Sequence, residues 1–248
     1  MIKPFLILQL RPEDAISDNE FEAFLRYGNL EVTDTRRVRM ELDGLPKLNL
    51  ENYSGIIVGG GPFCISDDYD KKPNQQKDFE GDLEILIKEI IEKDLPFLGA
   101  CYGLGALSTF AGGEVSKEKY QEEPGAIDVT LTEQGQEDIL TGDLPNTFRA
   151  FGGHKESCQS VPPQATLLAS SKTCPVQMIR IGKNVYATQF HPELDSEGIG
   201  LRINAYKHLG YFNPDDARKL IHDALQENIT IPQEILRRFV QTYRTTIN

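Results

Sequence analysis

The chain reads PFLGACYGLGALSTF over residues 96–110, and this stretch decides the fold. The apolar run before Gly99 predicts a buried strand, and the apolar residues after Gly103 predict a helix that follows at once. Glycines on either side of Cys101 suit a tight strand-to-helix turn, because larger side chains there would collide. Such a turn places a nucleophile at a helix N-terminus, where the helix dipole favours thiolate over thiol. Taken alone, the pentapeptide fits a small buried cysteine in a glycine-rich turn equally well.

Segments before this stretch alternate between strand and helix patterns. Short apolar runs at Phe5–Leu10 and Gly55–Val58 predict strands. Residues 17–20, SDNE, have the form of a capping box and precede apolar residues at helical spacing. Apolar residues recur at helical spacing over 83–91 and predict an amphipathic helix. Strands that alternate with helices predict an α/β fold, with a central parallel sheet and helices on both faces.

A polar stretch, rich in Asp, Lys, Asn and Gln, separates the second strand from the predicted helix at residues 67–82. It predicts a mobile surface loop. Its place after a run of glycines makes a lid over a binding site the alternative.

The second half of the chain predicts strands with little helix between them, and then a helical end. Asn213-Pro214 has the form of an N-cap with proline at N1, and Pro232 starts a further helix. The predicted strands are Ala126–Leu131, Thr147–Phe151, Ala165–Ala169, Val176–Ile181 and Val185–Gln189.

Length and composition restrict the class of protein. A chain of 248 residues suits one large domain, or one domain with a short extension. The net charge of -12 disfavours partners such as nucleic acid or a membrane surface, because both are anionic. The apolar N-terminus is short and lacks a cleavage site, so a buried strand is expected rather than a signal peptide. Four scattered cysteines suggest neither a disulfide framework nor zinc, and we expect a cytoplasmic protein without a metal site.

A second motif, QFHPE over residues 189–193, follows the last predicted strand. His191 lies just after the predicted strand, and Glu193 lies two residues further along the chain. A carboxylate in that position can hold the second ring nitrogen of the histidine, as the third group of a catalytic triad does. Together with the cysteine turn, the motif predicts a nucleophilic active site.

A third motif is the glycine run Gly59-Gly60-Gly61, which ends the second predicted strand. Three glycines leave backbone N–H groups unobstructed, as an oxyanion hole requires. A phosphate-binding loop is the competing interpretation, but neither a Walker Lys-Ser/Thr pair nor a GxGxxG motif follows.

In this order, the three motifs resemble the class I glutamine amidotransferase family, and within it a stand-alone glutaminase domain of the GMP-synthase type. The resemblance runs from about Phe5 to Asp195. It implies a domain over residues 1–195 with a flavodoxin-like sheet and a smaller antiparallel sheet. Residues 196–248 are then a C-terminal helical extension packed on the same domain.

The resemblance also implies roles for individual residues. Cys101 is the nucleophile, His191 the general base and acid, and Glu193 the residue that orients the histidine. No cofactor is implied. Further residues are expected to line the oxyanion hole or the substrate site: Gly60, Gly61, Tyr102, Gly105, Gly153 and His154.

Two substitutions depart from the family pattern. Gly105 stands where family members usually have a substrate-binding glutamine, so a larger substrate than free glutamine is possible. Residues 152–156 read GGHKE in place of a segment such as Ser-His-Gly-Asp. His154 is either a substrate-pocket residue or a histidine at a strand end.

These observations predict an enzyme that hydrolyses a γ-glutamyl amide through a thioester on Cys101. Residues 196–248 are too few for an ATP-binding synthetase domain. We therefore expect a separate ammonia-accepting synthetase as partner of an amidotransferase. The alternatives are a stand-alone γ-glutamyl hydrolase and a catalytically silent binding module on the same fold.

Overall fold

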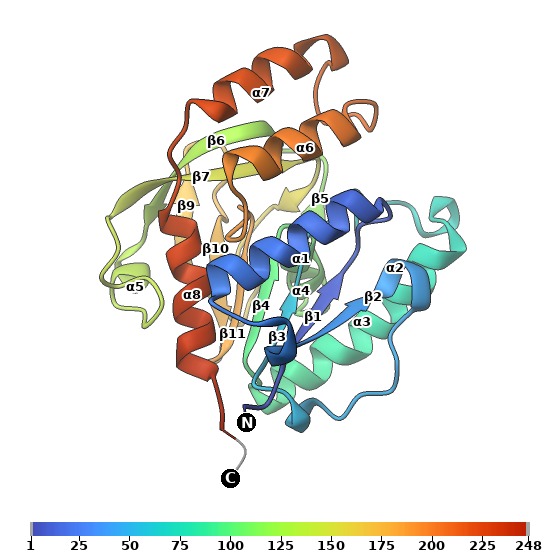
Figure 1. Cartoon of the computed structure of the whole chain (residues 1–248), viewed down its shortest axis with the longest axis vertical. Coiled ribbons are helices and arrows are strands. Elements are labelled where there is room, and N and C mark those ends of the chain that lie inside the picture. The colour runs from blue at the N-terminus through green and yellow to red at the C-terminus, as the bar shows by residue number, and fades with distance from the viewer. Residues whose placement is uncertain (1, 247–248) are drawn as a thin grey trace.

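Nine strands pair into one mixed sheet in the computed structural model, which describes residues 2–246 (Figure 1). One side of the sheet is parallel, in the order β2-β1-β3-β4-β11. It continues into the antiparallel strands β10-β9-β6-β7. The bounds are β1 Phe5–Gln9, β2 Thr35–Arg39, β3 Gly55–Val58, β4 Phe97–Ala100, β6 Glu122–Leu131, β7 Thr147–His154, β9 Ala165–Ser171, β10 Met178–Ile181 and β11 Val185–Thr188.

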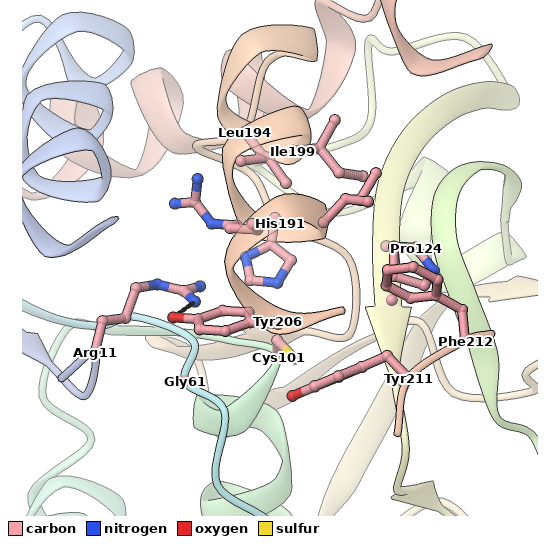
Figure 2. A pocket seen from close by; sticks show the side chains of 14 residues that line it. Arg11, Gly61, Cys101, Pro124, His191, Leu194, Ile199, Tyr206, Tyr211 and Phe212 are labelled. Carbon is pink, nitrogen blue, oxygen red and sulfur yellow. Dashed lines mark hydrogen bonds between the residues drawn. The ribbon is translucent and has the colours of Figure 1, made fainter. Parts of the chain in front are cut away.

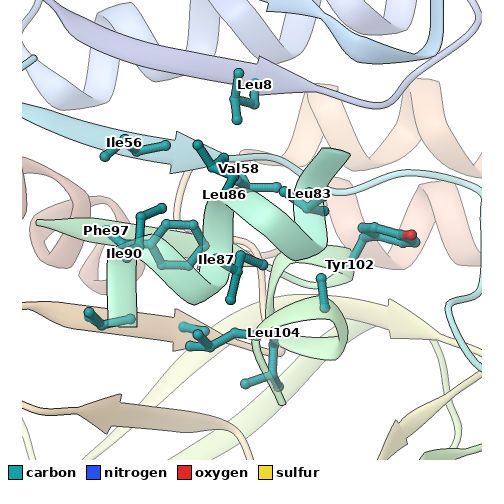
Figure 3. Packing of buried hydrophobic residues seen from close by; sticks show 14 of the residues in the cluster. Leu8, Ile56, Val58, Leu83, Leu86, Ile87, Ile90, Phe97, Tyr102 and Leu104 are labelled. Atoms are coloured by element: carbon teal, nitrogen blue, oxygen red, sulfur yellow. The ribbon is translucent and has the colours of Figure 1, made fainter. Parts of the chain in front are cut away.

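Helices cover both faces of the parallel strands. Leu6 and Leu8 of β1 pack in one apolar cluster with helices α3 and α4, shown in part in Figure 3. Phe5 and Ile7, which point the other way, pack in a second cluster with α1 and α8. The bounds are α1 Asp14–Gly28, α2 Met40–Asp43, α3 Asn74–Lys93, α4 Tyr102–Phe110, α5 Glu133–Gln136, α6 Ser196–Tyr206, α7 Ala217–Leu225 and α8 Ile231–Tyr243.

The predicted fold class is confirmed. The antiparallel strands extend the parallel sheet, and a two-stranded antiparallel sheet pairs β5 (Val115–Ser116) with β8 (Ser157–Cys158). Within residues 2–246, no helix is both long and apolar enough to cross a membrane.

The helices after β11 lie in two places. α6 and α7 form a third apolar cluster against Phe151 of β7 (Figure 1). The Asn213 side chain accepts a hydrogen bond from the backbone N–H of Asp215, as the predicted N-cap requires, and a 3-10 turn there leads into α7. α8, with its predicted proline in the first turn, returns to the parallel strands and packs beside α1.

The predicted start of α1 is wrong. The helix begins at Asp14, so Ser17 and Glu20 lie inside it and not at its cap. Both side chains make tertiary contacts instead. The Ser17 hydroxyl donates to Gln9 of β1, and Glu20 pairs with Arg11.

The prediction of a mobile loop over residues 67–82 is also wrong. A 3-10 turn spans Tyr69–Lys71, and α3 already begins at Asn74. The turn and the helix are joined by buried polar contacts. Lys72 Nζ donates to Glu80 Oε2 over 2.6 Å and to the carbonyl of Ile65 over 2.7 Å. These polar residues therefore stabilise a fixed structure.

The parallel strands β1, β3, β4 and β11 end at the same edge of the sheet, which is where α/β folds place their ligands. Arg11, the glycine run after β3, Cys101 and the segment after β11 follow those ends. The fold thus brings the three sequence motifs together.

Candidate active site

Cys101 occupies a sharp turn between β4 and α4. Its backbone has φ 52° and ψ -95°, a conformation that costs energy for a residue with a side chain. The Cys101 N–H donates to the carbonyl of Thr188 in β11 over 2.7 Å. A Cβ atom on Gly99 would lie 2.8 Å from the backbone of Gly103, so the turn requires its glycines. The Cys101 side chain is partly exposed.

His191 and Glu193 form a buried pair after β11. His191 Nδ1 donates to Glu193 Oε1 over 2.9 Å. The backbone N–H of His191 donates to the carbonyl of Phe151 in β7, which fixes the segment against the antiparallel strands. His191 and Cys101 line the same pocket, with the imidazole beside the thiol (Figure 2).

The electrostatics of this pair favour an imidazolium. Burial lowers the pKa of His191, but the Glu193 carboxylate and Cys101 outweigh it and raise the pKa to about 9. Burial likewise raises the pKa of Glu193, and His191, with Arg202 and Arg11, outweighs it and lowers the pKa to about 2. At neutral pH the pair is therefore an ion pair beside the thiol.

Two arginines and a glutamate surround this ion pair. Arg11, after β1, donates from Nε to Glu20 Oε1 over 2.5 Å. Arg202 of α6 places Nη2 3.8 Å from Glu193 and 4.0 Å from Glu20. All of these side chains are buried. Two guanidiniums and an imidazolium thus face two carboxylates, which leaves one positive charge for an anion such as a thiolate to balance.

The glycine run after β3 passes against His191, Arg11 and Leu10. A Cβ atom on Gly60 would lie 2.6 Å from the His191 ring and 2.8 Å from Arg11 Nη2, and one on Gly61 would lie 2.6 Å from the carbonyl of Leu10. Tyr102 is the first residue of α4, so its N–H has no carbonyl partner within the helix. These are the positions from which backbone donors can reach an oxyanion.

A pocket of about 330 Å³, its opening to solvent included, lies on one side of Cys101. It is named the polar pocket for the polar side chains that line it beside apolar ones, which are His154, Lys155, Glu156, Ser157 and Gln189. Gly105 borders it, and a Cβ atom built there would be in ordinary van der Waals contact with Ile65 at 3.4 Å and with Glu156 at 3.5 Å. The Glu156 carboxylate accepts hydrogen bonds from the N–H groups of Ile65 and Ser66 and from the Ser66 hydroxyl. One of its four lone-pair positions is left for a ligand.

His154 also borders the polar pocket, and both its ring nitrogens have protein partners. Nδ1 lies 2.9 Å from the carbonyl of Glu156, and Nε2 lies 2.8 Å from Glu122. The histidine therefore fixes the backbone at Glu156.

An apolar pocket lies on the other side of Cys101 (Figure 2). Its apolar wall comes largely from α6 and the residues around it, Leu194, Ile199, Ile203 and Phe212. Gly153 borders it with φ 152°, and a Cβ atom there would lie 2.9 Å from Pro124. Tyr211 borders both pockets.

Several residues of the site were not predicted from the sequence. Gln189 lies with Nε2 3.9 Å from Cys101 Sγ, and it is part of the QFHPE motif. Arg11 could have been found from its place after the first parallel strand. Arg202 and Tyr211 carry no comparable signal, because helix packing alone brings them to the site. The other cysteines are buried, and burial raises their pKa to between about 11 and about 12. Among residues 2–246, no cluster of three side chains could ligate a metal.

Comparison with known proteins adds to this geometry. The chain is 30% identical to the glutamine-hydrolyzing GMP synthase of Borrelia garinii subsp. bavariensis over 64% of its length, and it spans only 27% of that relative. It is 28% identical to one subunit of the glutamine-hydrolyzing GMP synthase of Pyrococcus abyssi, with 60% of this chain and 71% of that one aligned.

A solved structure extends the similarity to nearly the whole chain. The crystal structure of a glutamine amidotransferase from Thermotoga maritima superposes with a TM-score of 0.77 and 25% identity, over 97% of this chain and 98% of the other. The family model described as glutamine amidotransferase class-I matches residues 16–206. The chain therefore belongs to the class I glutamine amidotransferase family.

Proposed function

We propose that the protein hydrolyses the side-chain amide of a γ-glutamyl compound through a thioester on Cys101. The observation that carries this proposal is the strained turn that presents Cys101 beside the His191–Glu193 ion pair. The family membership supports the same chemistry.

The reaction begins with attack of the Cys101 thiolate on the amide carbonyl carbon. As the tetrahedral intermediate collapses, the C–N bond breaks and the His191 imidazolium gives its proton to the leaving nitrogen. Ammonia leaves, and the glutamyl group stays on sulfur as a thioester. Water then attacks the thioester while His191 takes its proton, and the C–S bond breaks to release glutamate. Amide and water are thus converted into glutamate and ammonia.

The other residues of the site assist these steps. The N–H groups of Gly60 or Gly61 and of Tyr102 bind the oxyanion in both halves of the reaction. Glu193 orients the imidazole and stabilises its protonated form. In the polar pocket, Glu156 and the backbone fixed by His154 bind the α-amino-acid end of the substrate.

The released ammonia goes to a separate synthetase chain. The relative from Pyrococcus abyssi is named as one subunit of a GMP synthase, which supports a two-chain arrangement. The chain spans only about a quarter of the relatives from Borrelia garinii and Borreliella burgdorferi.

The proposal is tested by measuring glutamate release from L-glutamine, with and without cell extract as a source of partner. Cys101→Ala should abolish the release. Cys174→Ala is the control, because it also removes a thiol, but one that is buried and borders neither pocket. If wild-type protein releases no glutamate from any γ-glutamyl amide, with or without extract, the proposal fails.

A further inference from the structure

The two pockets beside Cys101 differ in their walls. Glu156, Gln189 and Lys155 border only the polar pocket, whereas Leu194, Ile199 and Phe212 border only the apolar one. The pockets meet where Cys101, Gly61 and Tyr211 border both. A γ-glutamyl amide that reacts at Cys101 therefore has its two ends in different surroundings.

The position of His191 indicates which end of the substrate lies in which pocket. It borders the apolar pocket and not the polar one. In the proposed reaction this imidazolium protonates the leaving nitrogen, so the two must lie within hydrogen-bond distance. The leaving nitrogen then faces the apolar pocket, and the glutamyl group extends into the polar one.

The apolar pocket is larger than ammonia needs. Its empty space is about 450 Å³, the opening to solvent included, against about 330 Å³ for the polar pocket on the same measure. Ammonia would occupy little of this space and would leave the apolar side chains without a partner.

From this geometry we infer that the enzyme accepts γ-glutamyl amides whose nitrogen carries a short, uncharged alkyl group. The inference rests on the proposed function and specifies its substrate class. Leu194, Ile199, Ile203 and Phe212 form the subsite for the alkyl group.

Two charges at the edge of the subsite restrict the substituent further. Arg11 and Arg202 both border the apolar pocket, next to the His191 imidazolium. A cationic substituent would be repelled there and would lose its hydration without gaining a partner. The subsite therefore rejects amides whose nitrogen substituent carries a positive charge.

Gly105 borders only the polar pocket, which takes the glutamyl group. A substituent on the leaving nitrogen is therefore accommodated in the apolar pocket and not beside Gly105.

Turnover of an alkyl amide follows the same steps as turnover of glutamine. Cys101 displaces the nitrogen, which takes its proton from His191 and leaves as the alkylamine. Water then converts the thioester to glutamate. The amide and water give glutamate and one alkylamine.

Four substrates test the inference with the full chain: L-glutamine and its N-ethyl, N-propyl and N-(2-aminoethyl) amides. Glutamate release gives kcat/KM for each. Burial of each methylene is worth about fourfold, so the propyl amide should exceed the ethyl amide by about that factor. The aminoethyl amide matches the propyl amide in size but carries a charge, and its kcat/KM should be at least about tenfold lower.

A pair of variants ties this preference to the subsite. Ile199→Phe fills the pocket and should lower the ratio of propyl amide to glutamine turnover about tenfold. Leu201→Phe is the matched control, because Leu201 lies on the same helix with 45% of its side chain exposed. Its ratio should equal that of the wild type. A ratio measured within one variant does not depend on how much of that variant folds.

Three outcomes are informative. Turnover of glutamine without turnover of the alkyl amides overturns the inference and leaves the proposed function intact. An Ile199→Phe ratio equal to that of the wild type also overturns it, because the alkyl group then binds elsewhere. Failure with all four substrates refutes the proposed function itself.

Discussion

Arg202 places its guanidinium 3.8 Å from the Glu193 carboxylate, and both side chains are buried. Glu193 in turn accepts a hydrogen bond from His191, so helix α6 contributes a second cation to this buried pair. Glu193 thus has a cation on two sides.

Loss of the Arg202 charge should destabilise the fold and the site together. Arg202→Met leaves Glu193 and Glu20 with one cation fewer in a buried cluster, which should cost about 3 kcal/mol of unfolding free energy. Urea denaturation measures this. Arg237→Met is the control, because Arg237 pairs with Glu234 on the surface, and it should cost less than about 0.5 kcal/mol. Equal losses in the two variants would contradict the assigned role.

The activity should have an alkaline limit near the pKa of His191. The imidazolium that we propose as the acid for the leaving nitrogen is present below pH 9 and is lost as the pH rises through about 9. A plot of kcat/KM against pH should therefore fall above that value. Glu193→Gln removes the main stabilising charge, so its alkaline limit should move to lower pH. An unchanged limit in Glu193→Gln would show that another group sets it.

A methyl group on Gly60 should disable the site. Gly60→Ala places its Cβ 2.6 Å from the His191 ring, so the imidazole or the oxyanion loop must shift. We expect a loss of about a hundredfold in kcat, as for the loss of one oxyanion donor. Gly81→Ala in α3 has open space around its Cβ and should keep full activity with equal or greater stability. Full activity in Gly60→Ala would remove this loop from the catalytic centre.

Lys72 should prove far more important for stability than its neighbour Lys71. Lys72 is buried and pairs with Glu80, whereas Lys71 pairs with Asp68 at the surface. Lys72→Met leaves a buried carboxylate with fewer partners and should cost about 3 kcal/mol, while Lys71→Met should cost less than about 0.5 kcal/mol. Thermal or urea unfolding compares the two. Similar values would mean that the Lys72 contact adds nothing.

The spacing of apolar residues in the sequence was sufficient to predict the strands and helices that pack against the apolar core. The strands around residues 5–10 and 55–58 and the helix over 83–91 have regular apolar spacing, and the structure contains them. The glycines around Cys101 and the position of Glu193 could also be predicted, because each depends on residues nearby in the sequence.

Polar residues that bury through tertiary contacts could not be assigned in the same way. Ser17 and Glu20 have the spacing of a cap, but their partners Gln9 and Arg11 lie in and after β1. The first turns of α3 are polar because Gln76 and Glu80 make buried hydrogen bonds. Arg202 reaches the site only because α6 packs against it, and the spacing of residues in the sequence does not predict that packing.

The pairing of β4 with β11 has a consequence for folding. Ala100 and Thr188 are register partners, and the Cys101 N–H donates to the Thr188 carbonyl. Cys101 and His191 therefore come together only through a contact between segments far apart in the chain, and contacts of that kind form slowly. If these residues act as proposed, recovery of activity during refolding will report the closure of the central sheet, and a folding intermediate that has only local structure will be inactive.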